Sequence, residues 1–347
     1  MDPITQQGIA VAAGAGGGAQ AALAVAHSSS PFISVYEWDS GFGSKYANPS
    51  SLPTATVRGV AFSPGGDYLA LGHGNSPFLS VYPWSSDGFG TRYSNPSPLH
   101  DGTKYGVAWS PDGNDIAFGA GAPDRVIAYP WSSSGFGTKY SQPSTAPTGT
   151  GLGLAFSPDG NQLAVAHISS PYISVYPWSS GFGTKYSNPS TLPASTGYIA
   201  RFHPNGNALA VGHSGSPFIS VYAWSSSGFG SKYSNPSTLP AGTCSGIAFN
   251  PDGDVVAVAE ATHITPHLSA YVWNNGFGSQ YSNPSTALAS DGAKVAFSPD
   301  GNDIAFAHAG SPYVTAYPWS NGFGSKYSNP STLPTSTAYD VAFNPAA

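Results

Sequence analysis

The most regular segment of the chain, residues 151–189, has hydrophobic residues in short runs separated by turn residues. In the third run Ile173 and Val175 would share one face, while Ser174 and Tyr176 would face the other way. This alternation is the period-2 pattern of a β-strand. A Ser-Pro-Asp-Gly turn joins the first two runs and is typical of a hairpin. The four predicted strands, A to D, cover residues 151–156 (GLGLAF), 161–167 (NQLAVAH), 172–178 (YISVYPW) and 184–189 (TKYSNP).

The same pattern occurs seven times. A tryptophan ends each predicted strand C, and these tryptophans are 46 to 49 residues apart, a period typical of propeller blades or solenoid units. The chain enters the repeat at strand B (residues 21–27) and leaves it at strand A (residues 339–343). Pairing these two strands closes a ring, whereas an open array would leave two unpaired edges. The seven tryptophans are Trp38, Trp84, Trp131, Trp178, Trp224, Trp273 and Trp319.

We therefore predict an all-β protein, a seven-bladed β-propeller with four antiparallel strands per blade. Its ring is closed by the C-terminal strand A pairing with the N-terminal strand B. The propeller covers residues 20–347. Residues 1–19 are rich in Gly and Ala and lie outside the repeat, so we predict that they form an N-terminal anchor or arm that docks on another subunit or protein.

Composition excludes several other classes of protein. Charged residues make up only 8% of the chain, and 43 Gly and 32 Pro residues disfavour a helical protein. The 13% aromatic content disfavours disorder. The chain has 11 basic against 17 acidic residues, so it lacks the excess of positive charge that nucleic-acid binding needs. A single cysteine excludes an internal disulfide, and no apolar run is long enough for a transmembrane helix.

Histidines recur at the end of strand B in five blades, and each is followed by a short Ser-Pro turn with an aromatic residue. In the structural interpretation, each histidine is hydrogen-bonded within its own turn and each aromatic ring covers the core. The alternative is a ring of ligand pockets on this face, in which the rings would stack on sugars. A metal site is not expected, because equivalent residues of adjacent blades lie too far apart to share an ion. The candidate ligand-face residues are His27, His73, His167, His213, His308, Phe32, Phe78, Tyr172, Phe218 and Tyr313.

The third and sixth blades depart from the repeat. They offer Arg125, Glu260, His263 and His267 as candidate contacts with a partner protein. Pro266 disrupts the helical spacing that a zinc motif at His263 and His267 would need. No catalytic triad, carboxylate pair or phosphate loop stands out, so we predict no enzymatic activity, no metal and no cofactor.

The unit VAFSPDGNxLAVAHSSSPYISVYPW resembles the WD40 and YVTN-type propeller repeats, with VAFSPDG as the closest match. The opening MDPITQQGIAVAAGAGGGAQ resembles the short starts of tailed-phage virion proteins, and the repeated Gly-Phe-Gly-Ser/Thr-Lys-Tyr-Ser-Asn-Pro segments resemble phage-encoded propellers. These resemblances imply a binding scaffold or a virion component.

We therefore expect a non-enzymatic structural protein of a tailed bacteriophage virion, a propeller displayed on the tail or capsid. Its expected partners are other virion proteins through residues 1–19, host-surface glycans, or further copies of itself, with no nucleic acid and no membrane insertion. Two alternatives stay open. One is a lectin-like propeller whose equivalent weak sites gain strength by multivalency, and the other is a protein-interaction scaffold, either of them a cytoplasmic or extracellular soluble protein.

Overall fold

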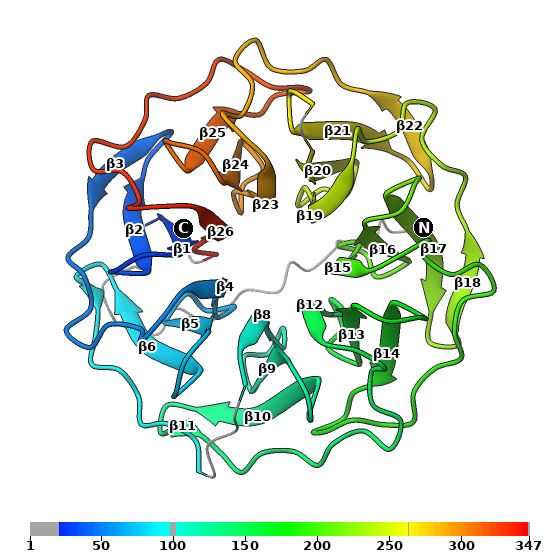
Figure 1. Cartoon of the computed structure of the whole chain (residues 1–347), viewed down its shortest axis with the longest axis horizontal. Coiled ribbons are helices and arrows are strands. Elements are labelled where there is room, and N and C mark those ends of the chain that lie inside the picture. Colours follow the sequence, from blue (N-terminus) through cyan, green and yellow to red (C-terminus); the bar gives the residue numbers. More distant parts are fainter. Residues whose placement is uncertain (1–20, 98–101, 263, 346–347) are drawn as a thin grey trace, which may run out of the picture.

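Seven small β-sheets stand around a central axis in the computed structural model, which describes residues 21–97, 102–262 and 264–345 (Figure 1). Each blade runs from an inner strand beside the axis to an outer strand at the rim. The inner strands are β26 (Ala338–Phe343), β4 (Val57–Phe62), β8 (Lys104–Trp109), β12 (Gly151–Phe156), β15 (Gly197–Phe202), β19 (Thr243–Phe249) and β23 (Gly292–Phe297), in blades 1 to 7 respectively.

The middle of each blade consists of two strands that are antiparallel to their neighbours. The second strands are β1 (Ala22–His27), β5 (Tyr68–His73), β9 (Asp115–Ala120), β13 (Gln162–His167), β16 (Ala208–His213), β20 (Val255–Ala261) and β24 (Asp303–His308). The third strands are β2 (Ile33–Trp38), β6 (Leu79–Ser85), β10 (Val126–Ser132), β14 (Ile173–Pro177), β17 (Ile219–Ser225), β21 (Leu268–Trp273) and β25 (Val314–Pro318).

The two ends of the propeller meet in blade 1, as predicted. Strand β26 pairs antiparallel with β1, with Leu23 opposite Phe343 and Val25 opposite Val341. Every inner strand also contacts the inner strands of the two adjacent blades, so the ring has no open junction. The predicted closure and the all-β propeller are confirmed.

Outer strands are shorter than the sequence pattern predicts, and they begin at the Gly-Phe-Gly segment. They are β3 (Phe42–Lys45), β7 (Gly88–Phe89), β11 (Gly135–Phe136), β18 (Gly228–Lys232) and β22 (Phe277–Gln280). In blades 4 and 7 only isolated bridges form, Trp178 with Phe182 and Trp319 with Phe323. The blades with β3, β18 and β22 have Glu, Ala or Val between the Tyr and Trp of the third strand, whereas the other four have Pro. Proline has no N–H to donate to a neighbouring strand, so it shortens the pairing.

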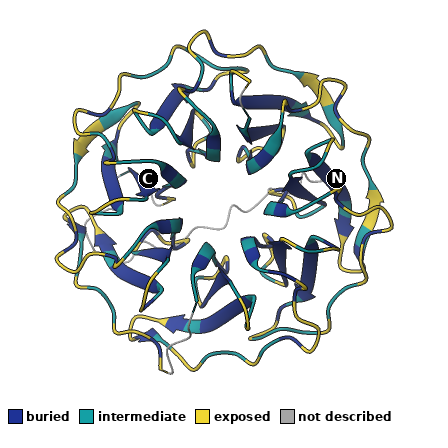
Figure 2. Cartoon of the chain, in the orientation of Figure 1, coloured by how far each residue is buried: buried dark blue, intermediate teal, exposed yellow. Residues whose placement is uncertain are grey.

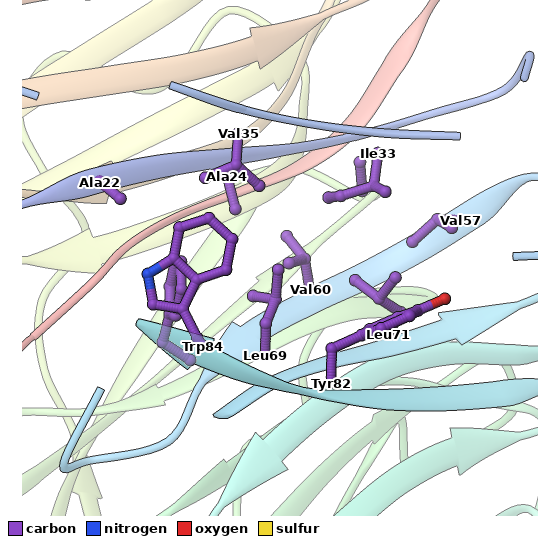
Figure 3. Packing of buried hydrophobic residues seen from close by; sticks show 12 residues of the cluster. Ala22, Ala24, Ile33, Val35, Val57, Val60, Leu69, Leu71, Tyr82 and Trp84 are labelled. Atoms are coloured by element: carbon purple, nitrogen blue, oxygen red, sulfur yellow. The ribbon is translucent and has the colours of Figure 1, made fainter. Parts of the chain in front are cut away.

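The hydrophobic core lies between blades. Each of the seven clusters found within the described residues combines side chains of two adjacent blades. Figure 3 shows one of them, where Ala24, Ile33 and Val35 of blade 1 face Leu69 and Trp84 of blade 2. Figure 2 shows the result, with buried strands in the blades and exposed segments along the rim. The tyrosine of each third strand is fully buried: Tyr36, Tyr82, Tyr129, Tyr176, Tyr222, Tyr271 and Tyr317.

Inner strands come so close to one another that small residues are required. A Cβ atom added at Gly59 would lie 2.3 Å from the carbonyl oxygen of Tyr105 in the next blade. The same addition at Gly153 would lie 2.6 Å from the carbonyl oxygen of Tyr198. The described residues contain no helix long and apolar enough to cross a membrane.

Candidate functional site

The five repeat histidines lie inside the blades. Each has no exposed surface, and its Nε2 atom lies 2.9 to 3.1 Å from a hydroxyl oxygen of the adjacent third strand. Burial lowers the pKa of each of them to about 4, so they are neutral near pH 7. This arrangement corresponds to the structural interpretation. The histidine–hydroxyl pairs are His27–Ser34, His73–Ser80, His167–Ser174, His213–Ser220 and His308–Thr315.

The aromatic residues that follow the Ser-Pro turns are half-buried. All five have φ between 67° and 70°, a left-handed conformation that fixes where the ring points. Phe32, Phe218 and Tyr313 pack against the clusters between blades. Their rings therefore cover the core beneath each turn. The five residues are Phe32, Phe78, Tyr172, Phe218 and Tyr313.

The candidate partner contacts occupy different environments. Arg125 and His267 replace the turn aromatic in blades 3 and 6, with φ of 66° and 65°. His267 Nδ1 lies 3.5 Å from a carboxylate oxygen of Asp291. Glu260 takes the histidine position of blade 6, is 1% exposed and accepts hydrogen bonds from Ser269 Oγ and the Ala241 amide. His263 lies outside the described residues, as does the predicted anchor of residues 1–19.

A different set of residues faces the central channel because every inner strand bulges at the same place. Near its start, the pairing of each inner strand with the second strand shifts register, and one residue, or in blade 3 both Tyr105 and Gly106, is left out of the ladder. A bulge of this kind re-aims a side chain. The bulge residues of blades 1 to 7 are Tyr339, Arg58, Tyr105, Leu152, Tyr198, Ser245 and Ala293.

All seven bulge residues line one cavity of about 350 Å³, which we call the mouth pocket. Its lining residues lie near the starts of the inner strands, so it occupies that end of the channel. Five residue types occur among the seven bulge residues, whereas the Tyr and Trp of the third strands are the same in all seven blades. The repeat symmetry is therefore broken at the channel and kept in the walls.

Charged side chains break the symmetry again farther into the channel. Asp340 and Lys294 stand where four other blades have Gly, and Arg201 stands where the other six have Ala. Lys294 lines the mouth pocket, while Arg201 and Asp340 line a second cavity of about 420 Å³ at the other end of the channel. The walls of this second cavity include the aromatic residue near the end of each inner strand: Phe62, Trp109, Phe156, Phe202, Phe249, Phe297 and Phe343.

These three charged groups are anchored to the backbone of neighbouring blades. Arg201 donates a hydrogen bond to the Leu154 carbonyl at 2.9 Å, and Lys294 donates one to the Ser245 carbonyl. The Asp340 carboxylate accepts one from the Val60 amide at 3.0 Å.

Enclosure in the channel controls the protonation of the same groups. Burial lowers the pKa of Lys294 to about 8, a shift that the charge of Asp340 opposes. Burial also lowers the pKa of Arg201 and raises that of Asp340, and the charge of Lys294 opposes the shift of Asp340. The three groups therefore interact electrostatically across the channel, and the lowered pKa of Lys294, about 8, lies close to neutral pH.

At the mouth, Arg58 lies between two aromatic rings. Its guanidinium carbon is 5.2 Å from the ring centre of Tyr339 and 5.6 Å from that of Tyr105. Within the described part of the chain it forms no ion pair and donates no hydrogen bond, and its Nε atom is buried without a partner. The described channel lining thus contains three cationic groups, Arg58, Arg201 and Lys294, beside two carboxylates, Asp340 and, at the mouth, Asp291.

None of these channel residues is among the candidates predicted from the sequence, which came from the repeated histidine turns and from the irregular blades 3 and 6. The bulge moves the channel-facing side chain out of the simple alternation. A position-by-position comparison of the seven A strands would have found them, because Arg201, Lys294 and Asp340 replace Gly or Ala. No group of three or more His, Cys, Asp or Glu residues that could hold a metal occurs among the residues described.

Comparisons with known proteins identify the fold. No protein-family model and no curated protein matches the chain. Among solved structures, it is similar to a periplasmic gluconolactonase from Pseudomonas aeruginosa, with 15% identity, a TM-score of 0.71, and coverage of 94% of this chain and 99% of that one. A protein from Lactobacillus plantarum gives 14% identity, a TM-score of 0.73 and coverage of 93% and 99%. A candidate 6-phosphogluconolactonase from Bacteroides uniformis gives 14% identity, a TM-score of 0.68, and coverage of 93% of this chain and 99% of that one. These matches establish a seven-bladed propeller of this general type and show no link to phage proteins.

Proposed function

We propose that this chain is a non-enzymatic binding propeller whose central channel holds a small anionic ligand. The observation that supports this proposal is the placement of Arg58, Arg201 and Lys294 in the channel. The other blades have Ala at the Arg201 position, four have Gly at the Lys294 position, and none has a charged residue at the Arg58 position. The chain has only 11 basic residues and a formal net charge of −6, so three cations in one channel are a concentrated exception.

Electrostatics favours an anion at this place. With Lys294 protonated, three cations stand beside two carboxylates, Asp340 and Asp291, which leaves an excess of one positive charge inside a channel enclosed by protein. Charges removed from water are costly unless they are paired. A bound carboxylate or phosphate would pair them and would accept charge-assisted hydrogen bonds from the guanidinium and ammonium groups.

The names of two similar structures indicate which anions to test first. A gluconolactonase acts on a lactone and produces a sugar acid, so gluconate and 6-phosphogluconate are suitable anionic probes and glucono-1,5-lactone is the neutral one. We expect calorimetric titration to detect binding of an anion and no binding of the lactone. Lactone hydrolysis above the rate in buffer would overturn the non-enzymatic part of the proposal.

Arg201→Ala is the sharpest variant, because six blades already have Ala at this position. It should weaken anion binding about tenfold or more, as expected for loss of a charged hydrogen bond, and should leave thermal stability unchanged or higher. Lys185→Ala, on the outer rim, is the matched control and should leave binding unchanged. Affinity should also fall as the pH rises through about 8, where Lys294 loses its charge. Equal affinity of the wild-type, Arg201→Ala and Arg58→Lys proteins would overturn the proposal.

The sequence also predicts a more specific role, as a structural protein of a phage virion, and this role stays a prediction. It depends on residues 1–19, which lie outside the described residues, and a channel that binds an anion is compatible with it. Removal of residues 1–19 should leave a folded propeller and abolish assembly with partner proteins. Size-exclusion chromatography with light scattering, run on both forms, tests this, and an unchanged assembly state would contradict it.

A further inference from the structure

We infer that the mouth pocket selects anions with a flat apolar body, such as aryl carboxylates. This inference rests on the proposed function, since it names the class of ligand that the channel would take. Two features of one pocket support it: the Arg58 guanidinium, which has no described hydrogen-bond partner, and the aromatic and aliphatic walls around it.

Arg58 is the anion-binding group of the pocket. A guanidinium binds a carboxylate through two parallel N–H···O bonds, and this geometry needs a fixed plane. The rings of Tyr105 and Tyr339, both within 6 Å of the guanidinium carbon, hold that plane through cation–π contacts. No described residue accepts a hydrogen bond from Arg58, and its Nε is buried, so the terminal N–H groups of the guanidinium are the donors left for a ligand.

The walls beside Arg58 are largely carbon. Leu152, Ala293 and Ala309 contribute aliphatic surface, and Tyr198 contributes a third aromatic ring. The hydroxyl of Ser245 is already used, since it donates to the Gly292 carbonyl at 2.6 Å. A ligand body in this pocket therefore contacts mainly hydrocarbon, which favours a flat ring over a polyhydroxylated chain.

Two further charged groups line the pocket. Lys294 adds a second cation, which strengthens the preference for an anion. Asp291 also lines the pocket, and its carboxylate lies 3.5 Å from His267 Nδ1. The pocket volume of about 350 Å³ is at the small end of ligand sites, so a single ring with one carboxylate is the right size.

Isothermal titration of the full chain with four probes tests this inference. Benzoate should bind about fivefold or more tightly than cyclohexanecarboxylate, because only the flat ring can stack on tyrosine. It should also bind about tenfold or more tightly than benzamide, which has the shape without the charge. Gluconate is the fourth probe and represents an anion without an apolar body.

Two variants place the site. Arg58→Lys keeps the positive charge and loses the planar fork, and it should weaken benzoate binding about tenfold while the melting temperature is unchanged. Tyr339→Leu should remove most of the preference for benzoate over cyclohexanecarboxylate. Lys185→Ala again serves as the control.

The outcomes separate the two proposals. If gluconate binds as tightly as benzoate, the inference is overturned and the proposed function stands. If neither anion binds, both are overturned. If benzoate binds but Arg58→Lys has no effect, the anion lies elsewhere and the inference is overturned.

Discussion

The walls of the propeller and the lining of its channel are made from the same repeat, yet they vary in opposite ways. In the third strands the buried tyrosine is identical in all seven blades, and the tryptophan two residues later is as well. At the bulge of the inner strands, five residue types occur in seven blades. The buried Tyr and Trp meet the same steric demand in every blade, whereas the half-buried bulge residues line the mouth pocket, where different side chains fit.

The channel lining and the channel backbone have different roles. The side chains at the bulges are half-buried and contribute little packing, but the strands that carry them close the ring. We therefore expect the backbone and the interblade side chains of the inner strands to be essential for stability. Substitution of the side chains that line the channel should change stability little. Four experiments test this division, from the largest expected effect to the smallest.

The largest effect should come from deletion of residues 338–347, which removes β26 and opens blade 1. The deletion exposes one edge of β1 and removes the buried side chains of Val341 and Phe343. Loss of these two side chains alone costs about 3 kcal/mol or more, before the lost strand pairing is counted. Thermal unfolding followed by circular dichroism measures the outcome. An unchanged melting temperature would contradict the closure of the ring.

The second experiment applies one substitution to both regions. Tyr176→Ala removes a fully buried side chain whose hydroxyl donates to the Thr145 carbonyl at 2.8 Å, and we expect a loss of about 3–5 kcal/mol. Tyr198→Ala removes a half-buried bulge residue at the channel mouth, and we expect a change below about 1 kcal/mol. Urea unfolding gives both free energies. Equal losses would show that the channel lining is structural.

These two regions also mark how far sequence reasoning reached. The sevenfold period, the permuted ends and the buried tyrosines and tryptophans could be predicted, because packing repeats the same residue at the same spacing. The alternation of residues alone could not reveal the channel site, since the shift in register at Arg58 or Tyr339 is set by the pairing of two strands. Only a comparison of the seven inner strands position by position would have pointed to it. The five histidines became candidate ligand residues because they recur at one position of the repeat. In this chain, a residue that recurs in this way serves the packing of the blades.

The third experiment concerns those histidines. The pKa of His167 is about 4 in the folded chain and 6.5 in an unfolded one, because burial disfavours the charged form. Between pH 6.5 and 4 the unfolded chain takes up a proton that the folded chain does not. Stability should therefore fall as the pH falls through this window, by up to about 1.4 kcal/mol per pH unit for each histidine.

Blade 3 supplies the matched variant, since it has Ala120 and Ile127 where blade 4 has His167 and Ser174. Five repeat histidines contribute to the pH dependence of the unfolding free energy. The double substitution His167→Ala and Ser174→Ile should remove the contribution of one of them. Chemical unfolding at pH 7.5, 5.5 and 4.5 measures it. The same slope in both proteins would mean that the buried histidine does not titrate as its environment indicates.

The smallest effect should come from the rim, where the outer strands vary in length. Pro177 has no N–H and blade 4 has only a bridge there, whereas Ala223 in blade 5 accompanies a five-residue outer strand. Pro177→Ala should extend pairing along residues 182–186, and Ala223→Pro should shorten β18. Hydrogen exchange at these amides should change in opposite directions in the two variants, with stability changes of about 1 kcal/mol or less, because outer-strand hydrogen bonds replace bonds to water. Unchanged exchange in both would mean that the loop, and not the proline, sets the length of the outer strand.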